Sequence, residues 1–477
     1  MIQFLVAAPC SGSGKTTLTC ALLAALKRRG QDPCSFKSGP DYIDPMFHRA
    51  VLGVESHNLD LFFSAPETVR ALYAQAAAGH GAAVCEGAMG FYDGLGGVSD
   101  TASAWHLADT LGLPVLLVVQ PRGASLTLAA QINGLKQFRT PSHLAGILLN
   151  DCAPHLYALL APMLERETCL PVLGYLPHLP DAALESRHLG LKTAGEIADL
   201  QQKISRMADA LVMDWEKLFA LTECAAPLVH TDRFPLAGEL PPQGAEEQRP
   251  RVPIAVARDA AFCFTYAETL EALERAGAEL CWFSPLQDPA LPEQIGGLYL
   301  PGGYPENRLE ELAGARLARE SIRSYIEAGG RTLAECGGMI YLSQSVLSDG
   351  DTDGGGSDTD GRSTGNSVSN VGNEMVGVLP FSITNERKRR KLTLGYRRFD
   401  YNGWRLKGHE FHYTQFAVPE TDGKEGGACS LPPSIAQVFN ARGEKVATPI
   451  FRYKNLIASY THLYWGEMDV MSLFGGV

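Results

Sequence analysis

The sequence lacks the features that would direct a protein into a membrane or out of the cell. No apolar run approaches the roughly 20 residues that a helix needs to cross a bilayer. Residues 1–6 carry no basic stretch and no cleavage site, so no secretory signal is predicted. No two of the 11 cysteines form a Cys-x-x-Cys pair. We therefore expect neither a disulfide framework nor a zinc site, but reduced thiols in a cytoplasmic protein.

Basic residues are scarce as well, since 41 Lys and Arg face 53 Asp and Glu and give a formal net charge of −12. This balance argues against binding to nucleic acid, which requires a basic surface. One local exception is the basic run formed by residues 387–391 with Arg397 and Arg398. The run is interpreted either as a solvated face or as a contact site for a polyanionic ligand.

With 477 residues the chain is too long for one ordinary core, so at least two domains are expected. Residues 1–225 alternate between apolar strand segments and helical patterns, which predicts a parallel sheet covered by helices. The expected strands are residues 2–8, 82–85, 115–119, 144–149 and 172–175, and residues 16–29 are an expected helix. Residues 226–250, rich in Pro, Gly and charge, are predicted to be a linker.

A second alternating block occupies residues 251–477, so the predicted fold is α/β with two doubly wound domains. Its expected strands are residues 253–257, 280–283, 297–300, 332–334 and 457–459. Residues 349–373 are almost entirely Gly, Asp, Ser, Thr and Asn, and they are predicted to form a disordered insertion. A shorter polar stretch at 420–433 is interpreted in the same way.

A phosphate-binding loop is predicted between the first strand and the first helix, in the segment Cys10-Ser11-Gly12-Ser13-Gly14-Lys15-Thr16-Thr17. Backbone N–H groups of Gly12, Ser13 and Gly14 can point at phosphate oxygens at the start of a helix. Lys15 would reach the β- and γ-phosphates and the Thr16 hydroxyl would bind Mg²⁺. The general pattern has Gly where this chain has Pro9. The alternative is a strand–helix turn that binds nothing.

Acidic residues follow two further strands of the same domain. Asp41 and Asp44 lie in one segment, and Glu86 and Asp93 lie in another. Because ligands of parallel sheets bind beyond the carboxyl ends of the strands, these residues are expected to hold Mg²⁺ or to place the substrate. Glu86 is the expected metal-holding residue. The alternative for each Asp is turn formation.

The segment Ala334-Glu335-Cys336-Gly337-Gly338 indicates a nucleophile on a tight strand-to-helix turn. Small neighbours permit the sharp bend, and the start of a helix favours a thiolate. Such a thiol needs a base, and the spacing does not choose among His409, His412 and His462. Glycines around Gly303, after another strand, suit an oxyanion. The alternative is a buried structural thiol.

With these motifs the chain resembles the cobyrinate a,c-diamide synthase family, including its relatives that act on hydrogenobyrinate. The resemblance covers nearly the whole chain. Its matching segments are residues 11–17, 39–45, 86–90, 187–191, 301–306, 335–338 and 408–412. Pro9 also fits, since family members often have Ala-Ala-Pro before this loop. Two departures are the absence of a His-x-His segment and the length of the 349–373 insertion.

The resemblance implies an N-terminal domain like dethiobiotin synthetase and a C-terminal domain like class I glutamine amidotransferases. It makes Cys336 the glutaminase nucleophile and His462 the residue that activates it. Gly303 and Gly337 would bind the oxyanion. Tyr464, two residues after His462, stands where other amidotransferases have an acid, and the resembling subgroup also lacks that acid.

The implied reaction is ATP-dependent amidation of the a- and c-side-chain carboxylates, with ammonia from L-glutamine and Mg²⁺ as cofactor. An acyl phosphate would form first, because oxide is a poor leaving group. Neither a membrane nor a nucleic-acid partner is expected. The open alternatives are another macrocycle such as nickel-sirohydrochlorin, a partition-type ATPase, and a binding module with an inert thiol domain. The sequence does not predict an oligomeric state.

Overall fold

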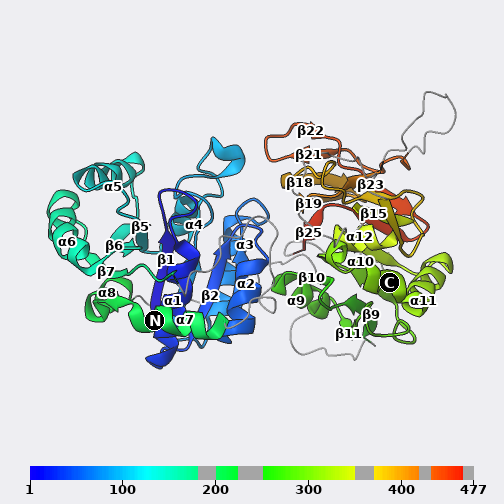
Figure 1. Ribbon diagram of the computed structural model, residues 1–477, viewed down its shortest axis with the longest axis horizontal. Coiled ribbons are helices and arrows are strands. Elements are labelled where there is room, and N and C mark those ends of the chain that lie inside the picture. The colour runs from blue at the N-terminus through cyan, green and yellow to red at the C-terminus, as the bar shows by residue number, and fades with distance from the viewer. Residues whose placement is uncertain (181–199, 224–250, 350–369, 418–430, 466–477) are drawn as a thin grey trace, which may run out of the picture. The chain divides into compact units, whose positions relative to one another are not determined.

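The structure is a computed structural model that describes residues 1–180, 200–223, 251–349, 370–417 and 431–465. The chain forms two compact units (Figure 1). Unit 1 comprises Met1–Leu236 with Tyr266–Glu268, and unit 2 comprises the remaining residues. The predicted linker at 226–250 and the matching segment at 187–191 lie outside the described residues.

Unit 1 is built on an eight-stranded sheet with the order β3-β2-β4-β1-β5-β6-β7-β8. All neighbours pair in parallel except β8, which is antiparallel to β7. The strands are β1 (Ile2–Ala7), β2 (Pro33–Ser38), β3 (Ser56–Leu59), β4 (Ala82–Glu86), β5 (Val115–Val119), β6 (Leu144–Asn150), β7 (Val172–Leu176) and β8 (Val212–Met213). The five strands predicted in this half are therefore confirmed to within two residues.

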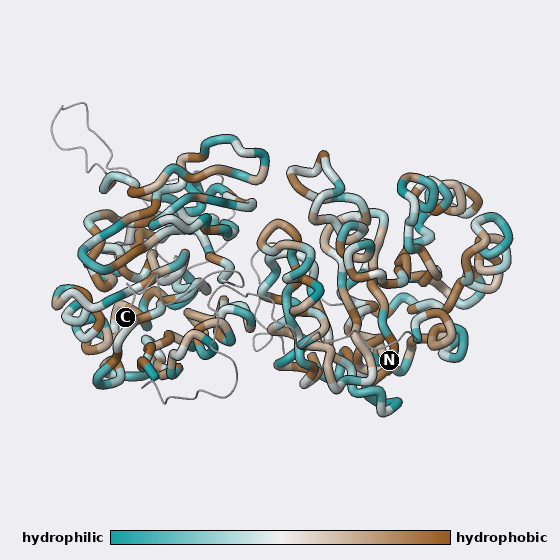
Figure 2. Tube along the Cα trace, turned by 180° about the vertical axis from the view of Figure 1, so that it is seen from behind, coloured by the Kyte–Doolittle hydropathy of each residue, from teal (hydrophilic) through white to brown (hydrophobic). Residues whose placement is uncertain are grey.

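Helices cover both faces of this sheet, which explains why its central strands β1, β5 and β6 are apolar at most positions. Along β1, Leu5 and Ala7 join one core cluster and Phe4 and Val6 join the other. Figure 2 shows the central strands in the brown of hydrophobic residues. The helices are α1 (Lys15–Arg28), α2 (Ile43–Phe47), α3 (Pro66–Ala77), α4 (Ala104–Leu111), α5 (Leu126–Phe138), α6 (Pro154–Thr168), α7 (Leu200–Ala210) and α8 (Trp215–Thr222).

Unit 2 contains a six-stranded sheet with the order β11-β9-β12-β14-β24-β23. It is parallel apart from its edge strand β23. Its strands are β9 (Val252–Ala257), β11 (Ala278–Phe283), β12 (Gly297–Leu300), β14 (Thr332–Glu335), β23 (Ile450–Tyr453) and β24 (Leu456–Ser459). The helices in this half of the chain are α9 (Ala267–Arg275), α10 (Leu309–Gly314), α11 (Arg316–Glu327) and α12 (Gly337–Leu342). The α/β prediction is confirmed in both units.

Smaller sheets in unit 2 were not predicted. A five-stranded antiparallel sheet has the order β22-β21-β18-β19-β25, a four-stranded sheet has the order β16-β15-β17-β20, and β10 pairs with β13. Their strands are β10 (Phe262–Phe264), β13 (Gly302–Gly303), β15 (Ser345–Asp349), β16 (Asn370–Glu374), β17 (Ile383–Thr384), β18 (Thr393–Tyr401), β19 (Trp404–His412), β20 (Gln415–Phe416), β21 (Val438–Asn440), β22 (Lys445–Val446) and β25 (His462–Tyr464).

The two ends of the polar segment at 349–373 form strands rather than disordered chain. Strand β15 pairs antiparallel with β16, with Asp349 opposite Asn370. Backbone hydrogen bonds between two strands do not require apolar side chains, so composition alone missed this pairing. Residues 350–369 and most of the stretch at 420–433 lie outside the described residues. No helix within the described ranges is long and apolar enough to cross a bilayer.

Candidate active site

The predicted phosphate loop connects β1 to α1. Gly14, at the cap of α1, has φ +88°, and a methyl group there would come within 1.9 Å of Asn150 Nδ2. The same amide donates a hydrogen bond to the Ser13 carbonyl (3.1 Å). Asn150, at the end of β6, thus supports the loop, a role that was not predicted. The available signal was a polar residue directly after a strand of apolar residues.

The other predicted loop residues differ in exposure and in their contacts. Gly12 is exposed with φ +79°, and Thr17 lies half-buried in the first turn of α1. The Lys15 ammonium donates hydrogen bonds to the carbonyls of Met89 and Cys10. Burial, followed by the charge of Lys37, lowers the pKa of Lys15 to about 8.

A buried polar cluster lies beside the loop at the ends of β2 and β4. The Thr16 hydroxyl donates to Glu86 Oε1 (2.5 Å) and approaches Asp44 Oδ2 (3.3 Å). Lys37 Nζ lies 2.7 Å from Glu86 Oε1 and is also paired with Asp44. Burial opposes the charge of Lys37, but the carboxylates of Asp44, Glu86 and Asp41 outweigh it and raise the lysine pKa. Burial also raises the pKa of Glu86, and Lys37 partly offsets that shift.

No role was predicted for Lys37. Both Lys37 and Ser38 lie within β2. A buried strand that contains a lysine is itself a signal, since a buried ammonium requires carboxylate partners. Lys37 has three such partners. Asp41 and Asp44 come from the segment after β2, and Glu86 comes from the end of β4.

The remaining acidic candidates behave differently from each other. Asp41 Oδ2 lies 3.7 Å from Lys37 Nζ, so Asp41 borders the cluster. Its other oxygen accepts a hydrogen bond from the Ile43 N–H (2.8 Å). Asp93 is exposed and accepts from the Gly90 N–H (3.0 Å). This contact is the turn-forming alternative, and no contact joins Asp93 to the cluster within the described residues.

The second predicted centre is the turn at Cys336, between β14 and α12. Cys336 has φ +43°, a conformation that is unusual for a residue with a side chain and typical of a strained nucleophile turn. Its N–H donates to the Ser459 carbonyl (2.7 Å). A methyl group at Gly338 would lie 2.1 Å from the Leu300 carbonyl oxygen, so only glycine fits there.

Strand β13 lies against both this turn and His462. A methyl group at Gly302 would come within 2.1 Å of His462 Cε1, so the imidazole packs against that glycine. A methyl group at Gly337 would lie 3.0 Å from the Gly303 backbone nitrogen. The structure therefore brings Cys336, His462 and the two predicted oxyanion glycines into one neighbourhood.

The three histidines that the spacing left open lie on two paired strands. His409 of β19 stands opposite His462 of β25, and their rings stack with centroids 5.0 Å apart. The His412 ring stacks on Tyr460 at 3.7 Å. Burial lowers the pKa of His409 to about 3 and that of His412 to about 4. Burial, followed by the charges of His409 and His412, lowers the pKa of His462, so all three rings are neutral at pH 7.

The sequence argument favoured a thiolate at Cys336, but the structure favours a thiol. Burial raises the pKa of Cys336 well above its ordinary value, and the charges of Glu306 and Glu410 add to the shift. The helix that follows is only six residues long, and its N-terminus does not offset the loss of hydration. The structure therefore disfavours the ionised sulfur in the absence of substrate.

Glu335 is a buried residue for which no role was predicted. Its Oε2 accepts a hydrogen bond from Tyr299 (2.8 Å), and its Oε1 accepts one from the Leu463 N–H (3.1 Å). Burial raises the pKa of Glu335 to about 8. Glu335, the residue before Cys336, is thus hydrogen-bonded to Leu463, the residue after His462.

Two family models match the two halves of the chain. Residues 4–191 match the CobQ/CobB/MinD/ParA nucleotide binding domain, and residues 253–470 match the CobB/CobQ-like glutamine amidotransferase domain. A hydrogenobyrinate a,c-diamide synthase of Brucella abortus is 36% identical over 97% of this chain and 98% of its own. The chain belongs to the cobyrinate and hydrogenobyrinate a,c-diamide synthase family.

Two cobyrinate a,c-diamide synthases are similar members of this family. That of Clostridium tetani is 39% identical over 72% of this chain and 75% of its own. That of Synechococcus is 34% identical over 98% of this chain and 95% of its own. Full-length similarity to relatives named for either acid confirms the family resemblance predicted from the motifs.

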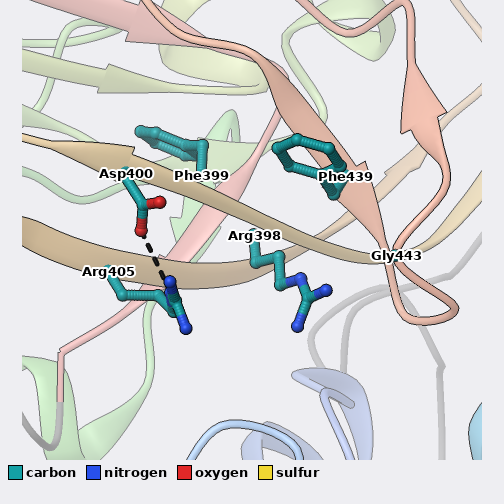
Figure 3. A pocket seen from close by; sticks show the side chains of 6 residues that line it. All are labelled: Arg398, Phe399, Asp400, Arg405, Phe439 and Gly443. Atoms are coloured by element: carbon teal, nitrogen blue, oxygen red, sulfur yellow. Dashed lines mark hydrogen bonds and ion pairs between the residues drawn. The ribbon is translucent and has the colours of Figure 1, made fainter.

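The basic run of this family member is not one continuous surface. Arg397 is buried and forms an ion pair with Glu410 (2.6 Å), so it is not available to a ligand. Arg398 lines a surface pocket of about 240 Å³ with Phe399, Asp400, Arg405, Phe439 and Gly443 (Figure 3). In Figure 3, Arg398 and Asp400 extend to one side of β18 and Phe399 to the other. The interpretation as a polyanion site therefore fails for Arg397 and remains a prediction for the rest.

Proposed function

We propose that this protein uses ATP and L-glutamine to amidate the a- and c-side-chain carboxylates of a cobyrinate- or hydrogenobyrinate-type tetrapyrrole. The observation that carries the proposal is the full-length match to such a synthase, 36% identical over 97% of the chain, which includes both predicted centres. The macrocycle is proposed as a class, because relatives named for cobyrinate and for hydrogenobyrinate are similarly distant from this chain.

In unit 1 the loop at residues 12–17 would bind the phosphates of ATP. Backbone N–H groups would hold the phosphate oxygens, and Lys15 would contact the β- and γ-phosphates. Transfer of the γ-phosphoryl group to a substrate carboxylate replaces an oxide leaving group by phosphate. Ammonia then attacks the acyl phosphate, and phosphate leaves as the amide forms. Asp41, Asp44 and Asp93 remain the proposed residues for substrate placement.

The Thr16–Glu86 pair suits Mg²⁺ as well. Thr16 Oγ1, Glu86 and Asp44 supply the hard oxygen ligands that this ion prefers. The described residues contain no ready-made cluster of three metal-binding side chains. Mg²⁺ commonly needs only one or two protein ligands beside nucleotide phosphates, so the set fits. When bound, the ion would neutralise charge on the transferring phosphoryl group.

In unit 2 Cys336 would attack the side-chain amide of glutamine, with His462 as the base that takes the thiol proton. The N–H groups of Gly303 and Gly337 would stabilise the oxyanion. Ammonia leaves with a proton from the imidazolium, and water later releases glutamate from the thioester. This assignment is supported by the packing of His462 against Gly302 and by the close approach of Gly303 to Gly337.

The test is to compare nitrogen sources in two variants. Cys336→Ala should lose glutamine-dependent amidation by at least about 1,000-fold and keep ammonia-dependent amidation, because only the nucleophile is removed. Lys15→Ala should lose both, because neither nitrogen source bypasses the acyl phosphate. Product formation is followed by chromatography with either glutamine or ammonium chloride. Equal loss of both activities in Cys336→Ala would refute the division of labour.

A further inference from the structure

Glu306 lies in the turn η5 (Pro305–Asn307), which directly follows the β13 glycines. This turn packs against the nucleophile segment, since a methyl group at Gly337 would lie 2.9 Å from Pro305 Cδ. The Glu306 residue is half-buried, but its Oε2 is inaccessible to solvent. Within the described part of the chain that oxygen has no hydrogen-bond partner.

Three carboxylates act on the Cys336 thiol, and two of them are held by other groups. Glu410 forms an ion pair with Arg397 through its Oε2, although its Oε1 has no partner among the described residues, and Glu335 accepts hydrogen bonds from two donors. Glu306 differs, because the cation that acts on it, Arg390, makes no ion pair with it in the described residues. The Arg390 guanidinium instead donates to Asn385 (2.9 and 3.0 Å).

This arrangement has two costs. Burying a carboxylate oxygen without a partner opposes folding. Burial raises the pKa of Glu306 to about 7, and its ionised form opposes ionisation of the sulfur that must become a thiolate. A cation bound to Glu306 would lower both costs. Glutamine brings such a cation, because its α-ammonium group is separated from the reacting amide by only a short aliphatic chain.

We propose that Glu306 binds the α-ammonium group of the glutamine whose amide is attacked by Cys336. The inference rests on the glutaminase role proposed for Cys336 and adds a residue that determines which amides are accepted. Binding the ammonium satisfies the buried oxygen and offsets one of the charges that, after burial, disfavour the thiolate. The nucleophile is therefore activated when an amide with an α-ammonium group is in place.

The test uses the full chain, with Glu306→Gln compared with the matched control Glu310→Gln. Glu310 is an exposed residue of the neighbouring helix α10. Substrates are glutamine and glutaramate, which is glutamine without its amino group. Loss of a charge-assisted contact should raise the KM for glutamine about 10- to 100-fold in Glu306→Gln. The KM for glutaramate should not rise, and iodoacetamide should alkylate Cys336 faster than in the parent protein.

The inference would be overturned if Glu306→Gln kept the parent's KM for glutamine and the parent's preference for glutamine over glutaramate. That result would leave the glutaminase role intact. If Glu306→Gln does not fold, the parent protein decides instead. Equal kcat/KM for glutamine and glutaramate would overturn the inference, and strong preference for glutamine would support it. Failure of the glutaminase role is a separate outcome, since Cys336→Ala would then still hydrolyse glutamine.

Discussion

Two buried lysines, Lys15 and Lys37, have opposite electrostatic surroundings although both lie beside the same loop. Burial and the neighbouring charge of Lys37 lower the pKa of Lys15 to about 8. Carboxylates raise that of Lys37 despite its burial. Lys37 therefore stays charged at all working pH values. Lys15 loses its proton in the mildly alkaline range, and with it the positive charge that would bind nucleotide phosphates.

This difference predicts how ATP binding depends on pH. Because the pKa of Lys15 is lowered, its charge is present below about pH 8 and is lost as the pH rises through that value. ATP phosphates favour the charged form, so above about pH 8 ATP binding should take up close to one proton and should weaken. Calorimetry in buffers of different ionisation enthalpy measures this uptake.

The control for this prediction is Lys15→Arg, because a guanidinium stays charged over the whole range. Its binding should take up no proton at this position. Equal proton uptake by the parent protein and Lys15→Arg at pH 9 would show that Lys15 is not the titrating group.

At the scale of secondary structure, Glu335 connects the end of β14 to β25. Its carboxyl group accepts a hydrogen bond from the N–H of Leu463, the residue after His462. This bond therefore holds the strand that carries the proposed base. Tyr464, not an acid, occupies the second position after His462. Glu335 holds His462 through the backbone instead of through the imidazole.

Glu335→Ala should lower kcat for glutamine hydrolysis by about 10- to 100-fold, because it leaves the Leu463 N–H unsatisfied. Glu335→Gln should keep most activity, since its amide oxygen still accepts from Leu463 and its amide nitrogen can donate to Tyr299. Steady-state kinetics measure both variants, and urea unfolding checks their stability. An active Glu335→Ala protein with parental kcat would contradict the positioning role.

Elements with a simple apolar pattern could be predicted, and those built around buried polar residues could not. Buried parallel strands such as β5 consist only of Val and Leu. In contrast β19 buries His409 and Glu410, and β18 buries Arg397, so their sequences do not show an apolar run. These polar residues are compatible with burial only because partners from other strands pair with them, and a single segment cannot reveal such partners.

At the scale of the whole molecule, both candidate centres could be proposed from the sequence because each depends on local backbone geometry. Glycines and one reactive side chain must be adjacent in the chain for a phosphate loop or a nucleophile turn. The supporting residues Lys37, Asn150 and Glu335 act through contacts between distant segments, and Glu306 was noticed through its buried oxygen without a partner among the described residues. Their roles required the structure.

We propose that unit 2 releases the glutamine amide nitrogen and that unit 1 activates the acid that receives it. The most direct measurement is mass spectrometry of cobyrinate and hydrogenobyrinate incubated with the protein, ATP, Mg²⁺ and amide-¹⁵N-glutamine. We predict two amidated carboxylates in one of these acids, each shifted by about 1 Da relative to product made with unlabelled glutamine, and no product without ATP. Unchanged acids in the complete mixture, or product that forms without ATP, would contradict the account.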